Sequence, residues 1–248
     1  MTKTTHVAPK GSVYYFTYGS NMARATMLRR SFSPTETVVC SLPGYQISFH
    51  LKGYPYIEPA FATVFPRTVE AAEKGNPRDA VGVVHLITDE EFNRIVHTEG
   101  GMGHKGWVYE VETVVVVAMD GQKYEAKVLS TPMDKVDEEY WPSRRYVDLC
   151  VAGATEQGLP ENYIAWMKAL PCYDPAKKTL LQKAGSLVFR VIFMPVMFAC
   201  FIPAMFLAKR NIQPPVVIAV LMVGSRKLAS GLHTYGFKYL FGSGLNHK

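Results

Sequence analysis

The sequence predicts an α+β fold in which a closed or partly closed sheet carries helices on its outside, followed by an apolar, basic C-terminal segment. Three observations support this. Short β-branched and aromatic runs alternate with turn signals, one helix has a complete capping signal, and residues 186–248 combine apolar and basic residues without any acidic one. The 248 residues suit one domain with an appended segment, and an apolar fraction of 48% is enough for a packed core and argues against disorder.

The expected strands are short and joined in part by hairpins. Residues 13–17 form a β-branched and aromatic run that breaks at Gly19, and residues 81–87 read as a buried strand. Residues 107–118 are a Val-rich strand, and residues 123–129 are its antiparallel partner. Between them, Asp120-Gly121 is a type I′ hairpin signal.

Two helices are expected outside the sheet. Thr88 and Glu91 form a capping box, in which the Thr88 hydroxyl accepts from the Glu91 amide while the Glu91 side chain reaches back. Apolar residues then recur at helical spacing, and Gly100-Gly101 ends this helix. Residues 160–170 predict the second helix, with Pro160 near its start.

The C-terminal segment is expected to associate with a membrane surface. It holds seven of the 27 Lys and Arg residues, which leaves 20 basic against 21 acidic residues in the rest of the chain. Residues 191–208 are 18 consecutive uncharged residues, close to the roughly 20 that a spanning helix needs, and lipid tolerates Pro195 and Pro203 better than water does. The alternative is a helix packed on the domain or on a dimer partner.

The charges around this run are compatible with more than one membrane topology. A single span with its basic end inside would place the preceding domain outside the cell, which fits poorly with free cysteines and with an N-terminus that has no signal-like apolar run. A hairpin or in-plane anchor through residues 186–224 keeps that domain in the cytoplasm.

The expected division is a flexible N-terminus over residues 1–12, a main domain over 13–170, a linker over 171–185 and the tail over 186–248. No zinc-finger spacing, RNA-binding signature or continuous basic helix predicts nucleic acid as a partner. The four cysteines lack C-x-x-C spacing, which favours free, buried thiols over a metal site or a redox dithiol. The sequence makes no prediction of an oligomeric state.

The first candidate site is Tyr18-Gly19-Ser20-Asn21-Met22, after the first strand. A strand that ends in Gly-Ser-Asn exposes successive backbone N–H groups, Gly19 is free to adopt a positive φ, and Ser20 and Asn21 add side-chain donors. Such a nest binds a carboxylate or an oxyanion. The alternative is a polar turn after a core strand.

The second candidate is Glu99, where the capped helix ends and a glycine-rich loop begins. A carboxyl at the negative end of the helix dipole suits general acid/base work, and the alternative is an exposed loop glutamate. His97 and His104 flank it. Because no third ligand accompanies them, ordinary polar roles are expected and no metal site is predicted.

Taken in order, these stretches resemble the γ-glutamylcyclotransferase family, over residues 13–170. The family's successive motifs are matched by Tyr15-Phe16-Thr17-Tyr18-Gly19-Ser20-Asn21, Ala62-Thr63-Val64-Phe65, Gly82-Val83-Val84, Glu99-Gly100 with Tyr109, Pro142-Ser143 with Tyr146, Gly153-Ala154 and Gly158-Leu159-Pro160. Each motif is short, and their common order is what makes the resemblance specific.

The resemblance implies a small mixed β-barrel-like core with flanking helices, and an intramolecular cyclisation. The α-amine of a γ-glutamyl group attacks its own γ-carbonyl, and 5-oxoproline leaves without a cofactor. Glu99 would move the proton, the loop from Tyr18 to Met22 would cradle the substrate, and Tyr109 and Tyr146 would position it.

Three segments depart from the family pattern. Residues 171–248 extend beyond typical soluble members, and residues 52–58 and 100–106 form enlarged loops. In this the chain is similar to fungal secondary-metabolite members of the gliotoxin-pathway type. That similarity implies glutathione-derived conjugates as substrates in epipolythiodioxopiperazine-type biosynthesis. The alternatives are a general γ-glutamyl amino acid or amine cyclotransferase, and an inactive membrane-attached binding module of the same fold.

Overall fold

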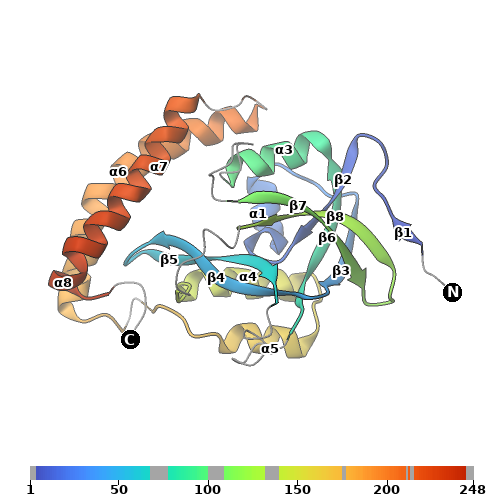
Figure 1. Ribbon diagram of the computed structural model, residues 1–248, viewed down its shortest axis with the longest axis horizontal. Coiled ribbons are helices and arrows are strands. Elements are labelled where there is room, and N and C mark those ends of the chain that lie inside the picture. The colour runs from blue at the N-terminus through green and yellow to red at the C-terminus, as the bar shows by residue number, and fades with distance from the viewer. Residues whose placement is uncertain are drawn as a thin grey trace. The chain divides into compact units, whose positions relative to one another are not determined.

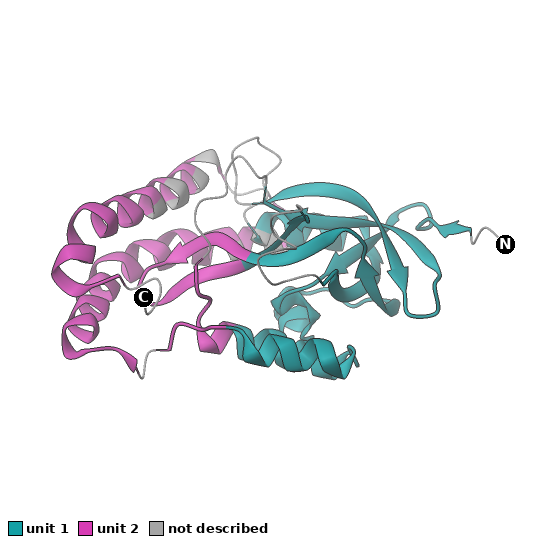
Figure 2. Cartoon of the chain, turned by 60° about the horizontal axis from the view of Figure 1, so that its bottom comes forward, with its two compact units in different colours: residues 1–48, 62–136, 147–170 teal, residues 49–61, 137–146, 171–248 magenta. Residues whose placement is uncertain are grey.

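The computed structural model describes residues 4–67, 78–99, 109–131, 140–174, 177–210, 212 and 215–243. It divides into two compact units that interleave along the chain (Figure 2). Unit 1 comprises residues 1–48, 62–136 and 147–170, and unit 2 comprises residues 49–61, 137–146 and 171–248. Residues 49–61 and 137–146 therefore group with the C-terminal segment, whereas the sequence division placed them in the main domain.

Unit 1 is built on a small closed barrel (Figure 1). Its strands are β2 (Ser12–Thr17), β3 (Glu36–Leu42), β6 (Ala80–Thr88), β7 (Glu110–Ala118) and β8 (Lys123–Ser130). They pair in the order β8-β2-β6-β3-β7, and β7 returns to β8 to close the barrel. The β2–β8 pair is parallel and the others are antiparallel, so the expected mixed, barrel-like core is confirmed.

The barrel interior is filled by the inward-facing residues of each strand. Phe16 of β2 lies opposite Val84 of β6 in the antiparallel register, and both are buried, as are Val116 of β7 and Val128 of β8. This alternation of inward and outward side chains is what the period-2 strand pattern requires. A short strand within the N-terminal residues 1–12 also joins the sheet, because β1 (Thr5–His6) pairs parallel to β8.

The hairpin between β7 and β8 is confirmed, but its predicted turn type is wrong. A type I′ turn needs positive φ at both central residues. Here Gly121 has a φ of 81° and Asp120 does not have a positive φ. The Gly121 N–H donates to the Ala118 carbonyl at 2.8 Å, so a single left-handed glycine closes the turn. The part of the expected strand before Tyr109 lies outside the described residues.

Helices surround the barrel of unit 1. Its 3₁₀ turn η1 (Ser20–Met22) leads into α1 (Arg24–Arg29), and α3 (Asp89–Thr98) packs against β2 and β6. The capping box of α3 is confirmed, since Thr88 Oγ1 accepts from the Glu91 N–H at 3.2 Å and the Thr88 N–H donates to Glu91 Oε2 at 3.0 Å. The expected stop at Gly100-Gly101 lies outside the described residues.

Two further helices follow the barrel strands. They are α4 (Arg144–Glu156) and α5 (Glu161–Ala169). Pro160 directly precedes α5, as the sequence predicted, because a proline is tolerated where the first helical N–H would lack a partner.

Unit 2 combines a hairpin tip with the C-terminal helices. The hairpin strands are β4 (Tyr45–Tyr54) and β5 (Glu58–Pro66), and the helical elements are α6 (Leu180–Lys209), α7 (Val216–Leu232), the π-helical turn η4 (His233–Phe237) and α8 (Lys238–Phe241). Helix α6 starts inside the expected linker and continues through Pro195 and Pro203. The four cysteines of the chain are buried and free.

Tyr56 at the hairpin tip is the centre of unit 2. It packs with Phe189 and Phe193 of α6 and Ala229 of α7, all buried. Its carbonyl accepts from Lys178 Nζ at 2.6 Å, and its hydroxyl donates to the Gly242 carbonyl at 2.7 Å. This packing explains why the hairpin tip groups with the C-terminal helices.

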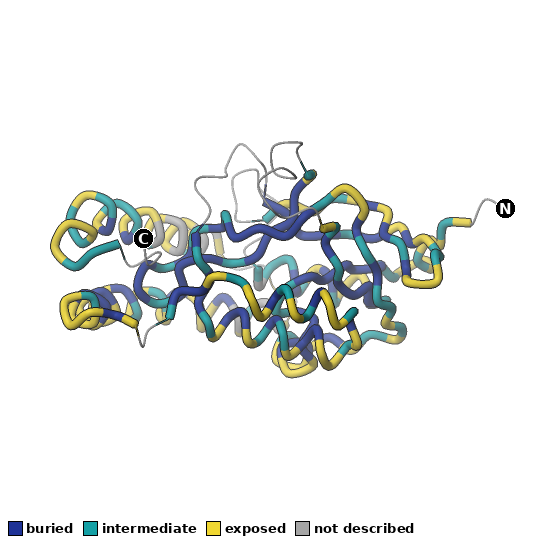
Figure 3. The backbone as a smooth tube through the Cα atoms, turned by 90° about the horizontal axis from the view of Figure 1, so that it is seen from below, coloured by how far each residue is buried: buried dark blue, intermediate teal, exposed yellow. Residues whose placement is uncertain are grey.

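One helix of the described chain is long and apolar enough to cross a membrane. It spans 25 residues, Leu180–Ala204, has a mean hydropathy of 2.2, and only 17% of its most apolar window is buried. Figure 3 shows exposed residues recurring along the C-terminal helices. A core helix of a soluble domain would bury most of such a window.

Candidate active site

Glu99 lies at the C-terminal end of α3, at the position that caps the helix. Its backbone has a φ of −87° and its N–H donates to the Ile95 carbonyl at 2.9 Å. Its side chain is only 19% exposed. The alternative of an exposed loop glutamate therefore does not hold, because the carboxylate is largely enclosed by protein.

A single oxygen of Glu99 receives both of the contacts that hold the carboxylate. Arg30 Nη2 lies 2.8 Å from Glu99 Oε1, and Asn21 Nδ2 donates to the same oxygen at 2.8 Å. Within the described ranges, Oε2 takes part in no hydrogen bond or ion pair. One oxygen is thus anchored while the other remains available to exchange a proton.

Arg30 is fixed by the way α1 ends. The Phe32 N–H donates to the Met27 carbonyl at 3.2 Å and the Ser31 N–H to the Leu28 carbonyl at 3.0 Å, which is the Schellman pattern of a helix C-terminus. Ser31 occupies the left-handed position, with a φ of 57°. Phe32 and Met27 belong to one buried cluster, so packing holds this helix end in place.

Asn21 links Glu99 to Tyr15. Its Nδ2 also donates to the Tyr15 hydroxyl at 3.0 Å, so both amide hydrogens are used within the protein. Its Oδ1 is buried and has no partner among the described residues. The sequence predicted that the Asn21 side chain would donate a hydrogen bond to a ligand. In the structure, the Asn21 group that remains for a ligand is the acceptor Oδ1.

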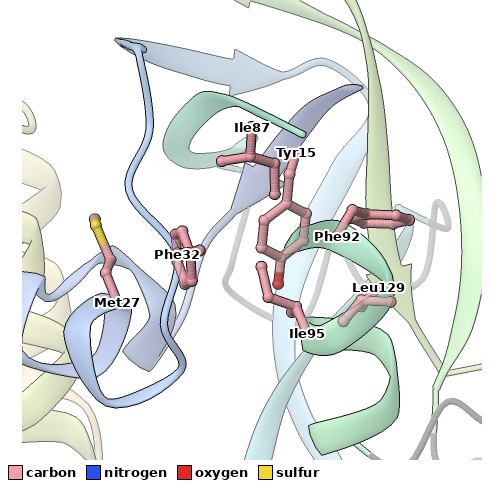
Figure 4. Packing of buried hydrophobic residues seen from close by; sticks show 7 residues of the cluster. All are labelled: Tyr15, Met27, Phe32, Ile87, Phe92, Ile95 and Leu129. Carbon is pink, nitrogen blue, oxygen red and sulfur yellow. The ribbon is translucent and has the colours of Figure 1, made fainter. Parts of the chain in front are cut away.

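Tyr15 is enclosed in the hydrophobic cluster beneath the site. Its ring meets Phe92 edge-on at 5.5 Å between centroids, and Figure 4 shows its hydroxyl on the Ile95 side, away from Ile87. Burial, and then the neighbouring charge of Glu99, raise the pKa of Tyr15. The phenol is therefore neutral at physiological pH.

The loop after β2 differs in detail from its prediction. Gly19 has a φ of −123°, so the expected positive φ is wrong. The loop instead continues into η1, where the Met22 N–H donates to the Gly19 carbonyl at 3.1 Å. The N–H groups of Ser20 and Asn21 donate to no other described residue, and so remain available to an anion.

The side chains at the two ends of this loop are part of the core. Tyr18 is buried, its hydroxyl donates to the Leu129 carbonyl, and burial raises its pKa well above the usual range. Met22 is fully buried, and its carbonyl accepts from Gln157 Nε2 at 3.0 Å. These two residues position the loop rather than presenting their side chains to a ligand.

The two expected positioning tyrosines fall in different units. Tyr109 of unit 1 is half-buried, donates its hydroxyl to the Ala62 carbonyl at 2.9 Å, and packs against the cluster that contains Tyr15. Tyr146 belongs to unit 2, where its ring meets Phe61 edge-on at 5.3 Å between centroids. Within unit 1, the structure brings Asn21 and Glu99 together.

The histidines near Glu99 do not form a metal site in the described part of the chain. Burial lowers the pKa of His97, which keeps it neutral, and no group of three or more His, Cys, Asp or Glu residues there could hold a metal ion. His104 lies outside the described residues.

Two members of the site, Arg30 and Tyr15, were not assigned roles there from the sequence. Tyr15 stood only in the core strand of the first motif. Arg30 stands beside Arg29 with nothing in the sequence to distinguish the two, whereas in the structure Arg29 is exposed and Arg30 turns inward.

Comparison with known proteins gives a consistent set of relatives. The model of the AIG2-like family matches residues 80–167. The chain is 30% identical over 200 residues to gamma-glutamyl cyclotransferase aclK of Aspergillus oryzae, covering 75% of this chain and 71% of the relative. It is 27% identical over 212 residues to gamma-glutamyl cyclotransferase gliK of Aspergillus fumigatus, covering 79% and 75%.

Solved structures share the fold. A human protein described as uncharacterized protein loc79017 matches with a TM-score of 0.54 at 23% identity, over 66% of this chain and 90% of that chain. A structure described as a gamma-glutamyl cyclotransferase matches with the same TM-score and identity, over 65% and 89%.

Proposed function

Because this chain belongs to the γ-glutamyl cyclotransferase family, we propose that it releases 5-oxoproline from γ-glutamyl compounds, with Glu99 as the residue that moves the proton. The observation that carries this proposal is the state of the Glu99 carboxylate. Its Oε1 is held by Arg30 and Asn21 while Oε2 has no partner within the described ranges. A general base needs this combination of fixed orientation and one uncommitted oxygen.

The reaction needs only one proton carrier. Glu99 Oε2 takes a proton from the substrate α-ammonium, and the resulting amine attacks the γ-carbonyl carbon to form a five-membered ring with an oxyanion and a protonated ring nitrogen. Glu99 passes its proton to the leaving nitrogen and takes the remaining extra proton from the ring nitrogen. The oxyanion then collapses, the bond to the leaving nitrogen breaks, and Glu99 gives up this second proton to the released amine, which leaves as an ammonium beside 5-oxoproline. Holding the substrate folded for ring closure supplies much of the acceleration, and no cofactor is required.

The loop after β2 supplies the complementary groups. The N–H groups of Ser20 and Asn21 suit the α-carboxylate or the developing oxyanion. Asn21 Oδ1, a buried acceptor beside Glu99, suits the α-ammonium. Gly19 carries no side chain that would block this approach, and Tyr18 and Met22 hold the loop from within the core. Tyr109 and Tyr146 remain proposed positioning residues.

Exchange of Glu99 for glutamine tests the reaction. Glu99→Gln keeps the shape and the Asn21 contact site but removes the proton carrier, so release of 5-oxoproline should fall by about 10²–10⁴-fold while substrate still binds. Glu90→Gln, an exposed position on the same helix, is the matched control and should retain full activity. Unchanged turnover by Glu99→Gln would refute the assignment.

For the substrate, we favour bulky glutathione-derived conjugates of the kind made in epipolythiodioxopiperazine-type fungal secondary metabolism. The relatives aclK and gliK, both named gamma-glutamyl cyclotransferases, support the reaction class. A general γ-glutamyl amino acid or amine substrate is the alternative. Assaying a γ-glutamyl dipeptide beside a glutathione conjugate separates them, and preference for the dipeptide would contradict the conjugate.

An inactive binding module of the same fold is a further alternative. It predicts that a γ-glutamyl ligand is bound but recovered uncleaved. The presence of Glu99 with an uncommitted oxygen argues against it, because a binding module has no need for a free proton-transfer atom.

We also propose that the enzyme attaches to an anionic membrane surface through residues 186–224, with its catalytic domain in the cytoplasm. One face of α6 is buried, with Phe189 and Phe193 inside unit 2, while Val191 and Ile202 are exposed. The segment also has basic residues and no acidic ones. An exposed apolar helix face with a basic surround is typical of interfacial attachment.

A further inference from the structure

Arg30 is the strongest unassigned feature of the site. We propose that it is a positioning residue that fixes Oε1 of Glu99, so that Oε2 is the atom that exchanges the proton. This inference rests on the proposed function of Glu99 as the proton carrier. Arg30 does not itself exchange a proton, because a guanidinium stays charged at all physiological pH values.

The ion pair lies where two helix ends meet. Arg30 caps the C-terminus of α1, and Glu99 caps the C-terminus of α3. A carboxylate at a helix C-terminus faces the negative end of the dipole, which disfavours its charged form. An arginine in contact with the carboxylate offsets this, and the same positive charge is favourable at the end of its own helix.

The Arg30–Glu99 ion pair is largely shielded from solvent. Its side chains are 14% and 19% exposed, so water and salt screen the pair less than they would an exposed one. A second contact joins the two helices, because Arg94 Nη2 of α3 donates to the Ser31 carbonyl at 3.3 Å. The Schellman turn and this contact hold the backbone around Arg30, and the ion pair places its guanidinium against Glu99 Oε1.

Among the described residues near Glu99, the tyrosines and the histidine are neutral, whereas Arg94 of α3 carries a second positive charge beside the end of α1. Burial raises the pKa values of Tyr15 and Tyr18, both of which sense the charge of Glu99, and lowers the pKa of His97. Among the described residues, Arg30 makes the one ion pair to Glu99. Arg30 therefore supplies the positive charge that contacts the carboxylate and holds it in place.

This arrangement has a kinetic consequence. Oε2 can accept the ammonium proton only when the carboxylate is correctly oriented toward the substrate. Removing Arg30 leaves Oε1 with the Asn21 contact alone, so the carboxylate should stay in the site but lie less often in the productive orientation.

The test is the separate measurement of kcat and KM for 5-oxoproline release by the full chain. Arg30→Gln should lower kcat on the order of tenfold, the kinetic equivalent of about 1.4 kcal/mol. KM should stay close to the wild-type value, because Arg30 contacts Glu99 and is not proposed to bind the substrate. Arg30→Lys, which keeps a charged donor, should restore much of kcat. Arg29→Gln, exposed on the same helix, is the matched control and should behave as wild type.

The outcomes separate this inference from the function on which it rests. An active wild type with an unchanged kcat in Arg30→Gln overturns the role of Arg30 alone. A higher KM with unchanged kcat also overturns it, because Arg30 would then bind the substrate carboxylate. A wild-type chain that cyclises no γ-glutamyl compound overturns the proposed function instead. Thermal unfolding of each variant identifies loss of activity caused by unfolding, and Arg30→Lys keeps the test decisive in that case.

Discussion

Asn21 and Glu99 are in contact although 78 positions separate them in the sequence. This contact determines which atoms of each side chain remain available to a ligand. The amide hydrogens of Asn21 are used on Glu99 and Tyr15, which leaves its buried Oδ1 for a ligand. A residue type alone does not reveal this, since an asparagine presents both donors and an acceptor. The neighbouring structure decides which of them remains.

His85 shows how burial of one residue couples folding to pH. It is fully buried in β6, with Nδ1 3.1 Å from Thr37 Oγ1, and burial lowers its pKa to about 4. The unfolded chain, with a histidine pKa near 6.5, binds a proton that the folded state excludes. Stability should therefore fall as the pH drops from about 6.5 toward 4, and be fully present above this window.

A His85→Gln variant tests this coupling. When the pH falls from 7.5 to 5, His85 should lower the free energy of unfolding of the wild type by roughly 2 kcal/mol. The variant lacks this histidine, so its free energy of unfolding should not show this decrease. Denaturant unfolding at both pH values measures the difference. His6→Gln, at an exposed histidine, is the control and should keep the wild-type pH dependence. Equal dependence in wild type and His85→Gln would contradict the prediction.

At the scale of elements, α4 positions the loop after β2 by close approach. A Cβ at Gly153 of α4 would lie 2.6 Å from the Ala23 nitrogen and 3.0 Å from the Met22 carbonyl carbon. Gln157 on the same helix donates to the Met22 carbonyl. The glycine of the Gly-Ala motif is therefore explained by packing against the loop that precedes α1.

Gly153→Ala should accordingly be destabilising, although glycine to alanine inside a helix normally stabilises by up to about 1 kcal/mol. Forcing the two backbones apart should cost roughly 1–3 kcal/mol and lower cyclisation activity, because the loop carries Ser20 and Asn21. Unfolding and activity assays measure both effects. Gly224→Ala in α7, where a Cβ would meet no atom within 4 Å, should not destabilise. A more stable, fully active Gly153→Ala would refute the packing argument.

At the scale of the whole molecule, the C-terminal helices form a unit with the tip of the β4–β5 hairpin. Tyr56 packs against Phe189, Phe193 and Ala229, so truncating the chain before α6 would expose this cluster. If a truncated chain lost membrane binding, the cause could therefore be either removal of the membrane-binding helices or disruption of this cluster. Substitution on the exposed face of α6 tests attachment without disturbing the buried face.

Ile202→Glu should reduce binding to vesicles that contain anionic phospholipid. Ile202 is 61% exposed, and a charge on a lipid-facing helix position should weaken binding by about tenfold or more. Val7→Glu, at a position that is 66% exposed in unit 1, makes the same charge change and should bind as wild type. Vesicle co-sedimentation measures this. Equal sedimentation of Ile202→Glu and wild type, or no vesicle binding by either, would refute membrane attachment.

The sequence by itself determined the features that depend on short-range chemistry. The capping box at Thr88 and Glu91, the β7–β8 hairpin, the apolar C-terminal helix and the ordered family motifs are all encoded within a few neighbouring residues. The tertiary structure decided what depends on distant contacts. It closed β7 onto β8, grouped residues 49–61 with the tail, and selected Arg30 rather than Arg29 as the partner of Glu99. These outcomes depend on which side chains the closed barrel and its helix ends bring within bonding distance, and local sequence patterns do not specify such long-range contacts.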